Sequence, residues 1–334
     1  MQINAQTMQD LFSTFSAKFR DGMQRGRLPT VADSTLAANL IRFKDICFKV
    51  TSGGESEVHS WLKQVIGFKE WVGDRVATMI ETDGIRVINR FFHETVSIPR
   101  EKIEDDQVGV YGELISAMGG EASDDAFPLD LCIDALRFPE TWADGVAFFS
   151  AAGRSFGANV ICNDLANADL TRANLKTASG YLMGYLGENN LPFNVLPAMV
   201  LCGNQAFFKA NSLYKNQLIV EGAATTSNDV QGMIPPKFHP RLEPNEWYVV
   251  GLRGGFLPLC FQERRPISSL IQLINPSDPN VFWQRQFVYG CDGRAAGFSP
   301  FPFQIVRGYS PAAASTPQVV PGAGDKKGAI GKGK

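Results

Sequence analysis

Residues 84–136 constrain the fold more than any other part of the chain, because a strand pattern passes there directly into a helix pattern. Apolar and polar side chains alternate over 92–98, which is the period of a strand with one buried face. The apolar face holds Phe92, Val96 and Ile98, and the polar face holds His93, Thr95 and Ser97. We therefore predict a half-buried strand that ends at Pro99.

A long helix is predicted after this strand. The acidic triplet Glu104, Asp105 and Asp106 stands where carboxylates satisfy the unpaired N–H groups of a helix N-terminus. Helical spacing follows at Tyr111, Leu114, Ile115, Met118, Ala122, Ala126, Leu129, Ile133 and Leu136. A helix of about 30 residues would be roughly 45 Å long. Gly119, Gly120 and Pro128 are expected to bend it.

The composition is that of a globular protein. The 334 residues are 44% hydrophobic and 20% charged, with a formal net charge of −2 and a pI near 6.0. Such a chain can bury a sizeable core in about two domains, and its overall charge does not favour nucleic acid. No apolar run approaches the roughly 20 residues that span a bilayer, and the N-terminus lacks a signal-peptide pattern. We predict a cytosolic protein without membrane contact.

The six cysteines are scattered without a C-x-x-C pair, most of them inside apolar runs. A structural zinc site needs clustered ligands. Buried free thiols are therefore predicted.

An amphipathic helix is predicted near the N-terminus, over residues 7–20. Its apolar face holds Met8, Leu11, Phe12, Phe15 and Phe19. A basic stretch of Lys18, Arg20, Arg25 and Arg27 leads from it to Pro29. This arm is set off from the body by Gly and Pro, so we expect a neighbouring chain to supply its packing partners.

The segment between Phe48 and Gly84 alternates between order and turns. Val58, Trp61, Leu62, Val65 and Ile66 have the spacing of a short helix, and Asp83-Gly84 reads as a turn. Two tryptophans, Trp61 and Trp71, are unusual in a turn-rich surface segment. They predict that this segment docks on another surface.

The rest of the chain predicts a mixed α+β domain, a set of strands and a tail. A helix around 168–188, a strand in 191–203 and a helix in 205–216 alternate. Strands are predicted in 247–252, 256–261, 281–291 and 301–308, with Asp292-Gly293 as a hairpin turn. After Tyr309 four lysines face one aspartate in a segment nearly free of large apolar residues, which predicts a flexible basic tail.

No catalytic, cofactor or metal constellation stands out. His59, His93 and His239 are the three histidines, and none belongs to a nucleophile motif. The acidic triplet fits a helix cap better than a cation site, because cation sites draw carboxylates from several segments. Gly331-Lys332 is followed by Gly333, so the tail is not a phosphate loop. No cofactor and no metal are predicted.

Particular strings carry a resemblance to a known family. Residues 61–75, 88–111, 144–149, 258–266 and 280–297 resemble, in order, the major head subunit of Mu-like phages. The likeness covers roughly Ser52 to Gly308. It departs after Phe149, where Ser150 to Arg154 replace an expected His-Pro, and the tail beyond 309 has no counterpart.

The resemblance implies an α+β fold of the HK97 capsid type. Its parts would be an N-terminal arm (1–50), an extended loop (51–99), a peripheral domain with a spine helix (100–139), an axial domain (140–245), peripheral return strands (246–308) and the tail (309–334). A major capsid protein of this kind builds the hexamers and pentamers of an icosahedral head around double-stranded DNA. Portal, scaffold and decoration proteins would be its partners, and it would enter the virion after assembly in the host cytoplasm.

Candidate interface residues follow from this map. On the extended loop they are Trp61, Glu70, Trp71, Asp74 and Arg75, which would meet a neighbouring subunit. On the arm they are Lys18, Arg20, Arg25 and Arg27, which would meet DNA phosphates without reading bases. The alternative for these four is pairing with acidic residues of a neighbouring subunit.

Two other functions stay open on the sequence. One is the shell of a nanocompartment with the same fold, which encloses cargo enzymes. The other is a hydrolase that uses a Ser or Cys with His93 or His239. The basic arm and the extended loop favour the phage head.

Overall fold

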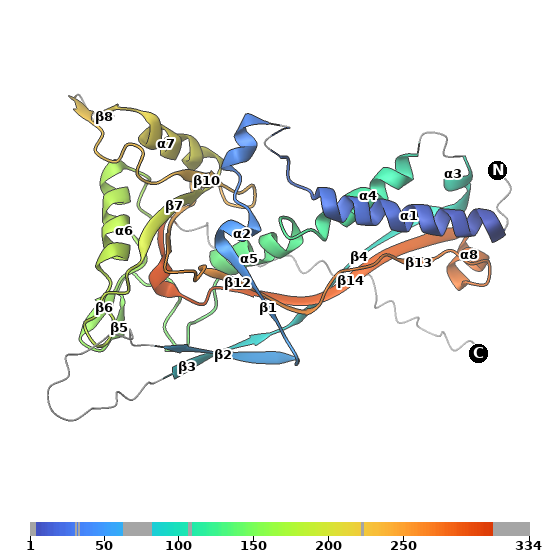
Figure 1. The fold of residues 1–334 in the computed structure, drawn as a ribbon, viewed down its shortest axis with the longest axis horizontal. Coiled ribbons are helices and arrows are strands. Elements are labelled where there is room, and N and C mark those ends of the chain that lie inside the picture. Colours follow the sequence, from blue (N-terminus) through green and yellow to red (C-terminus); the bar gives the residue numbers. More distant parts are fainter. Residues whose placement is uncertain are drawn as a thin grey trace, which may run out of the picture.

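The computed structural model is elongated, with two halves joined end to end and a hairpin below their junction (Figure 1). The structure describes residues 5–30, 32, 34–62, 82–105, 109–221 and 224–309. The half at the left of Figure 1 is called the axial half, and the half at the right, with α1 and α4, is called the peripheral half.

The peripheral half is built on a five-stranded sheet. Its central strand β14 (Gln286–Phe298) pairs antiparallel with β4 (Arg90–Pro99) along one edge. Along the other edge it pairs antiparallel with β12 (Leu259–Arg265) and β13 (Ile271–Leu273). Strand β1 (Cys47–Thr51) extends the sheet parallel to β12. The alternation predicted for β4 is confirmed, because Phe92, Val96 and Ile98 are the less exposed residues of that strand.

The single long helix predicted after β4 is wrong. The structure has three helices, α3 (Arg100–Glu104), α4 (Val110–Glu121) and α5 (Phe127–Arg137). Pro128 lies in the first turn of α5, where proline's missing N–H has no cost, so it starts a helix instead of bending one. The Asp125 carboxylate accepts the backbone N–H of Phe43 at 2.7 Å, a long-range contact that occupies the segment between α4 and α5.

The acidic triplet was predicted to cap the N-terminus of the long helix, and this is wrong for its two described residues, Glu104 and Asp105. Glu104 ends α3 and Asp105 is the C-cap residue of α3, while the N-cap of α4 is Gly109. Gly109 has φ 75°, a left-handed conformation that glycine adopts at little cost. Helix α4 therefore begins at a glycine turn and has no side-chain cap.

The N-terminal helix α1 (Ala5–Arg25) packs on its own chain, so the expectation that it depends on a neighbour is wrong. It lies along α4 (Figure 1). A Cβ on Gly22 would stand 1.8 Å from the Ser116 carbonyl oxygen, and one on Gly119 would stand 2.0 Å from the Phe19 carbonyl oxygen. The two backbones therefore approach as closely as glycine allows.

Apolar side chains complete this contact. Phe15 and Phe19 of α1 are buried with Ile115 of α4 and with Tyr289 of β14. The rings of Phe15 and Tyr289 are 5.1 Å apart. Of the predicted apolar face, Phe15 and Phe19 are thus buried between α4 and the sheet, whereas Phe12 is 48% exposed.

The axial half has a four-stranded sheet in the order β10 (Pro236–Phe238), β7 (Leu196–Cys202), β11 (Trp247–Leu252), β15 (Ile305–Tyr309). Helices α6 (Arg172–Gly184) and α7 (Asn204–Lys215) pack on it, as the periodicity predicted. Two hairpins complete this half: β5 (Arg154–Phe156) with β6 (Asn159–Ile161), and β8 (Leu218–Glu221) with β9 (Ala224–Ser227). The range 246–308 therefore supplies strands to both sheets.

The hairpin turn predicted at Asp292-Gly293 is wrong, because β14 runs straight through both residues. Asp292 forms an ion pair with Arg265 at 2.9 Å. A Cβ added to Gly293 would stand 3.1 Å from the Arg265 carbonyl oxygen. Both residues pair with β4, and this pairing outweighs the local turn preference of the dipeptide. The segment before β14 also differs from the prediction, since residues 279–284 form helix α8 (Pro279–Gln284).

The extended loop begins as a two-stranded hairpin of β2 (Ser56–Leu62) and β3 (Thr82–Ile88). The short helix predicted from Val58 is wrong in its described part, and Asp83-Gly84 lies inside β3. Three short helical turns complete the chain: η1 (Thr35–Asn39), α2 (Phe43–Ile46) and η2 (Pro302–Gln304). All six cysteines are free, and all except the half-buried Cys162 are buried, which confirms the prediction for the thiols.

Adding one methyl group at Gly119 is expected to separate α1 from α4. The new Cβ meets a backbone carbonyl that cannot move aside, so we expect Gly119→Ala to lower the free energy of unfolding by about 1–3 kcal/mol and to expose α1 to protease. Urea unfolding and limited proteolysis of unassembled subunits measure both effects.

The matched control is Gly180→Ala on α6, where nothing lies within 4 Å of the added Cβ. Alanine is the better helix former, so this variant should gain roughly 0.5–1 kcal/mol. Equal behaviour of the two variants would contradict the close approach of the helices.

Candidate assembly surfaces

A buried polar network holds the base of the extended loop. Gln262 of β12 is fully buried, and its amide donates to the Asn89 side chain at 2.8 Å. His59 of β2 lies 2.6 Å from the Gln262 oxygen and stacks on Phe298, with ring centroids 4.7 Å apart. Asn89 in turn donates to the Ser52 hydroxyl at 2.9 Å. Buried polar groups with satisfied partners fix one arrangement, so the hairpin leaves the body in a defined direction.

The turn before β2 is fixed by one carboxylate. Glu57 accepts the backbone N–H groups of Gly53 at 2.8 Å and Gly54 at 3.1 Å, and the Ser52 hydroxyl at 3.1 Å. These hydrogen bonds, the one from Gly53 first, lower the pKa of Glu57. Gly53 and Gly54 thus lie in a tightly bonded turn.

Most of the predicted loop interface lies outside the described residues. Glu70, Trp71, Asp74 and Arg75 fall in 63–81, and Trp61 is near the end of β2. The described part of the loop shows exposed apolar side chains at its base, where Val58 is 65% and Ile88 55% exposed.

Three of the four basic arm residues have acidic partners within the chain. Lys18 lies 2.8 Å from Glu113, and Arg25 lies 3.7 Å from the same carboxylate. Arg27 contacts Glu121 and Asp130, each at 2.8 Å. Arg20 is exposed on α1. Acidic residues of α4 and α5 therefore neutralise most of the positive charge of the arm. The side chains of Lys18 and Arg25 nevertheless stay exposed.

Asp130 of α5 is the centre of a charged junction between the two halves. Besides Arg27 it contacts Arg241, which follows β10, at 3.2 Å, and Arg241 also pairs with Asp134. The His239 ring nitrogen Nε2 faces Asp130 Oδ1 at 3.4 Å, and neither atom has a hydrogen bond. Burial lowers the pKa of His239 to about 4, while the charge of Asp130 opposes the shift. His239 is thus a neutral side chain enclosed by charges.

A second buried pair joins α5 to the axial sheet. Glu246, fully buried, accepts from Arg137 Nε at 2.9 Å and from the Glu243 N–H at 2.8 Å. The Tyr248 hydroxyl donates to the same carboxylate. Burial raises the pKa of Glu246, and its hydrogen bonds oppose this. The sequence analysis missed both junctions, because Arg137 and Glu246 are 109 residues apart and no local signal links them.

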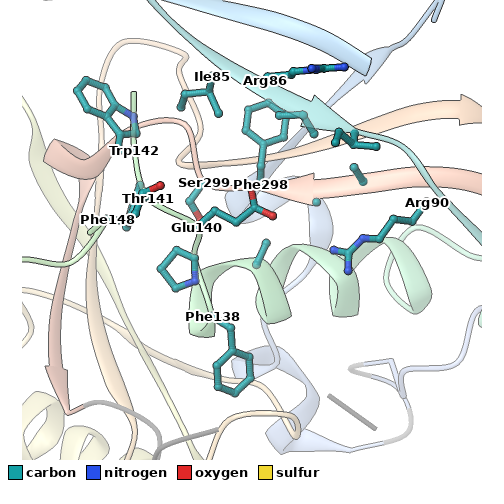
Figure 2. Close-up of a pocket in the computed structure, with 16 residues that line it drawn as sticks. Ile85, Arg86, Arg90, Phe138, Glu140, Thr141, Trp142, Phe148, Phe298 and Ser299 are labelled. Atoms are coloured by element: carbon teal, nitrogen blue, oxygen red, sulfur yellow. The ribbon is translucent and has the colours of Figure 1, made fainter. Parts of the chain in front are cut away.

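A groove of about 310 Å³ lies between the loop and the end of α5 (Figure 2). Ile85 and Arg86 of β3 stand on one side, and Phe138 and Glu140 on the other. Among the described residues that line this groove, Glu140 is the single acidic one and none is a histidine or a cysteine.

The outer face of the peripheral sheet carries an apolar patch that the sequence analysis missed. Gln272 of β13 donates to the Ser16 hydroxyl of α1 at 2.9 Å, so its neighbours Ile271 and Leu273 face the other way. They are 50% and 45% exposed. Asn280 of α8 donates to the Leu273 carbonyl at 2.9 Å, which places α8 beside this face.

Helix α8 adds two aromatic rings. Phe282 is 65% and Trp283 78% exposed. Ile271, Leu273, Phe282 and Trp283 are called the outer patch below. The dipeptide Asp278-Pro279, a helix start, was the sequence signal for α8.

Two further observations concern membranes and metals. Among the described residues, no helix combines the length and apolar character needed to cross a bilayer. The same residues contain no group of three or more His, Cys, Asp or Glu placed to hold a metal ion.

Residues 8–160 and 239–309 match the profile of the family described as "Mu-like prophage major head subunit gpT". The chain is 25% identical over 285 residues to the "Mu-like prophage FluMu major head subunit" of Haemophilus influenzae, covering 85% of this chain and 67% of that protein. It is 33% identical over 110 residues to the "Major capsid protein" of Escherichia phage Mu, covering 32% of this chain and 35% of that protein.

A solved structure shares the fold. The subunit in the procapsid of bacteriophage JBD30 superimposes with a TM-score of 0.51 at 20% identity, covering 93% of this chain and 77% of that chain. The likeness confirms the HK97-type α+β capsid fold expected from the sequence.

Replacing His239 is expected to remove a pH dependence of stability. The folded pKa of about 4 lies below the ordinary 6.5, so the unfolded chain binds more protons between these values. Stability is therefore complete above about pH 6.5 and falls by about 3 kcal/mol as the pH drops towards 4. His239→Asn should flatten this dependence, as urea unfolding from pH 7 to 4 measures.

His93 provides the control, since it is exposed on β4. His93→Asn should leave the pH dependence of the parent chain intact. An unchanged pH dependence in His239→Asn would contradict the burial of a neutral imidazole.

Proposed function

The chain belongs to the family of Mu-like prophage major head subunits, and we propose that its copies assemble into pentamers and hexamers of an icosahedral head that encloses double-stranded DNA. The observation that carries the proposal is the family match over about two thirds of the chain. The family also favours a phage head over a nanocompartment shell, and a structural subunit over an enzyme.

The fold supports assembly through the extended loop. The hydrogen bonds around Gln262 fix the direction in which the hairpin leaves the body. The two loop tryptophans, Trp61 and Trp71, are large enough to anchor an interface. The outer patch supplies an exposed apolar surface of matching character. We assign the loop of one subunit to the outer patch of a neighbour, with Glu70, Asp74 and Arg75 setting the orientation.

The basic arm supports a weak and sequence-independent contact with DNA. Lys18, Arg20 and Arg25 lie on exposed parts of α1, and Arg27 is tied to Asp130. Phosphate contacts of this kind need charge but no base recognition. Portal, scaffold and decoration proteins belong to the same proposal as further partners, as does assembly in the host cytoplasm before incorporation into the virion.

Shortening the loop is expected to abolish shells without unfolding the subunit. Residues 63–81 are replaced by Asn-Gly, which joins β2 to β3 through a two-residue turn. Negative-stain microscopy should show closed particles for the parent chain expressed alone and only soluble subunits or small oligomers for the variant. Trp283→Ser should weaken assembly in the same direction, because it removes the most exposed ring of the outer patch.

Leu36→Ser is the control, since Leu36 is 51% exposed on η1, outside the outer patch. It should form normal shells. Normal shells from the shortened loop would refute the loop contact, and a parent chain that forms no particles either alone or with its scaffold protein would refute the proposed function.

Neutralising the arm is expected to reduce the salt dependence of DNA binding. Each lost phosphate contact lowers the slope of log K against log salt by about 0.9, so Lys18→Gln, Arg20→Gln and Arg25→Gln together should lower it by up to about 3. Arg27 is kept because it pairs with a buried carboxylate. Titration of unassembled subunits with double-stranded DNA measures the slope.

The axial pair Lys209→Gln and Lys215→Gln, on α7, is the control and should leave the slope unchanged. An unchanged slope in the arm variant would contradict the DNA contact and would show that these charges act only in the packing of α1 on α4.

A further inference from the structure

The β8–β9 hairpin presents an uncharged apolar face to solvent. Side chains alternate along β8, so Ile219 packs against the core while Leu218 is 59% and Val220 73% exposed. Their cross-strand neighbours on β9 are Ser227 and Thr225, both exposed. Among the described strands, β8 and β9 pair with each other alone. This ribbon stands at the outer corner of the axial half (Figure 1).

A groove of about 400 Å³ lies in the same half, between α6, β7 and residues 229–234. Its apolar lining comprises Leu175, Met183, Leu196, Pro197, Val230 and Met233. Met183 is 56%, Leu196 66% and Met233 67% exposed. Exposed side chains at this density mark a surface that another chain covers.

The charged groups at the rim of the groove are already paired with one another. Lys176 and Asp229 both line it and pair with each other, and Arg172 contacts the same carboxylate at 3.7 Å. A charged occupant would leave its own charge without a partner there, whereas the ribbon face of Leu218, Val220 and two hydroxyl-bearing residues brings none. The electrostatics of groove and ribbon therefore match.

The ribbon and the groove consist of different residues of one chain. A contact between two such patches is heterologous, so each copy uses its ribbon on one neighbour and offers its groove to the other. Contacts of this kind close into a ring when the rotation per subunit permits. Rings are the form that the proposed pentamers and hexamers require, and the inference rests on that proposed function.

We propose that the β8–β9 ribbon of one subunit occupies the α6–β7 groove of the next subunit around each ring, with Val220 against Met233. The occupant is thus a second copy of this chain, and the contact sets the head-to-tail order of the axial halves. The loop contact of the peripheral half is a separate interface.

A disulfide between copies tests this contact in the full chain. Val220→Cys and Met233→Cys are combined in one chain, shells are formed, and the thiols are oxidised with oxygen and a copper catalyst, each disulfide forming as two electrons and two protons pass to oxygen. A heterologous ring predicts a ladder of covalent oligomers above the dimer on a denaturing gel without reductant. Either substitution alone should lose the ladder.

The matched control combines Met233→Cys with Val160→Cys, since Val160 on β6 is 60% exposed and lies outside both patches. It should give no ladder, and neither should the parent chain, whose cysteines are buried or half-buried. A ladder equally strong in this control would overturn the proposal, because it would report random collision.

The remaining outcomes separate the inference from the proposed function. Shells that form normally but give no ladder with Val220→Cys and Met233→Cys overturn the ribbon contact and leave the proposed function standing. A product that stops at the dimer shows a symmetric contact in place of the ring and also overturns it. A parent chain that forms no shells overturns the proposed function and, with it, this inference.

Discussion

Pairing on both edges of β14 is the constraint on which the rest of the structure depends. The strand has 13 residues, and hydrogen bonds to β4 on one side and to β12 and β13 on the other hold it as one continuous element. Its inward face receives the aromatic residues of α1, and its end carries Phe298, on which His59 of the loop stacks. The spine, the sheet and the loop base are therefore fixed relative to one strand. A stiff, continuous strand of this kind suits a subunit that must meet its neighbours at a set distance.

The two halves share one apolar core, and buried charged pairs add directional contacts at their junction. Arg137 with Glu246, and Asp130 with Arg27 and Arg241, connect α5 and the arm to the axial half. Removing two charges from water costs about as much as their attraction returns, so these pairs add little net stability. Their directional hydrogen bonds do define one relative orientation. The junction thus specifies the angle between the halves, which in a closed shell decides how neighbouring subunits meet.

The sequence predicted those elements whose periodicity reflects their own burial. Strand β4, helices α6 and α7 and strand β11 are of this kind, because each has one face or a whole segment in the core. It failed where a distant residue decides the local structure. Asp125 binds the backbone of Phe43 in the segment between α4 and α5, and pairing with β4 overrides the turn preference of Asp292-Gly293.

The candidate site was predictable to a smaller extent for the same reason. The basic residues of the arm were visible, but their partners Glu113 and Asp130 lie some 90 to 100 positions away, so their neutralisation was not. Close packing of α1 depends on two glycines, one on each helix, that meet only in the fold. The outer patch was hidden because the apolar run Val281-Phe282-Trp283 was assigned to a strand, although Asp278-Pro279 starts a helix.

Several modest contacts per subunit are a physical advantage for a closed container. The outer patch and the axial groove each expose only a few apolar side chains, so one contact alone offsets little of the entropy lost on association. A subunit that uses a ribbon, a groove, a loop and a patch at once gains from the high effective concentration that the first contact creates for the others. Single contacts then stay reversible while the closed shell is stable, which allows misplaced subunits to leave before closure. The apolar surfaces exposed on both halves are consistent with this use of the chain.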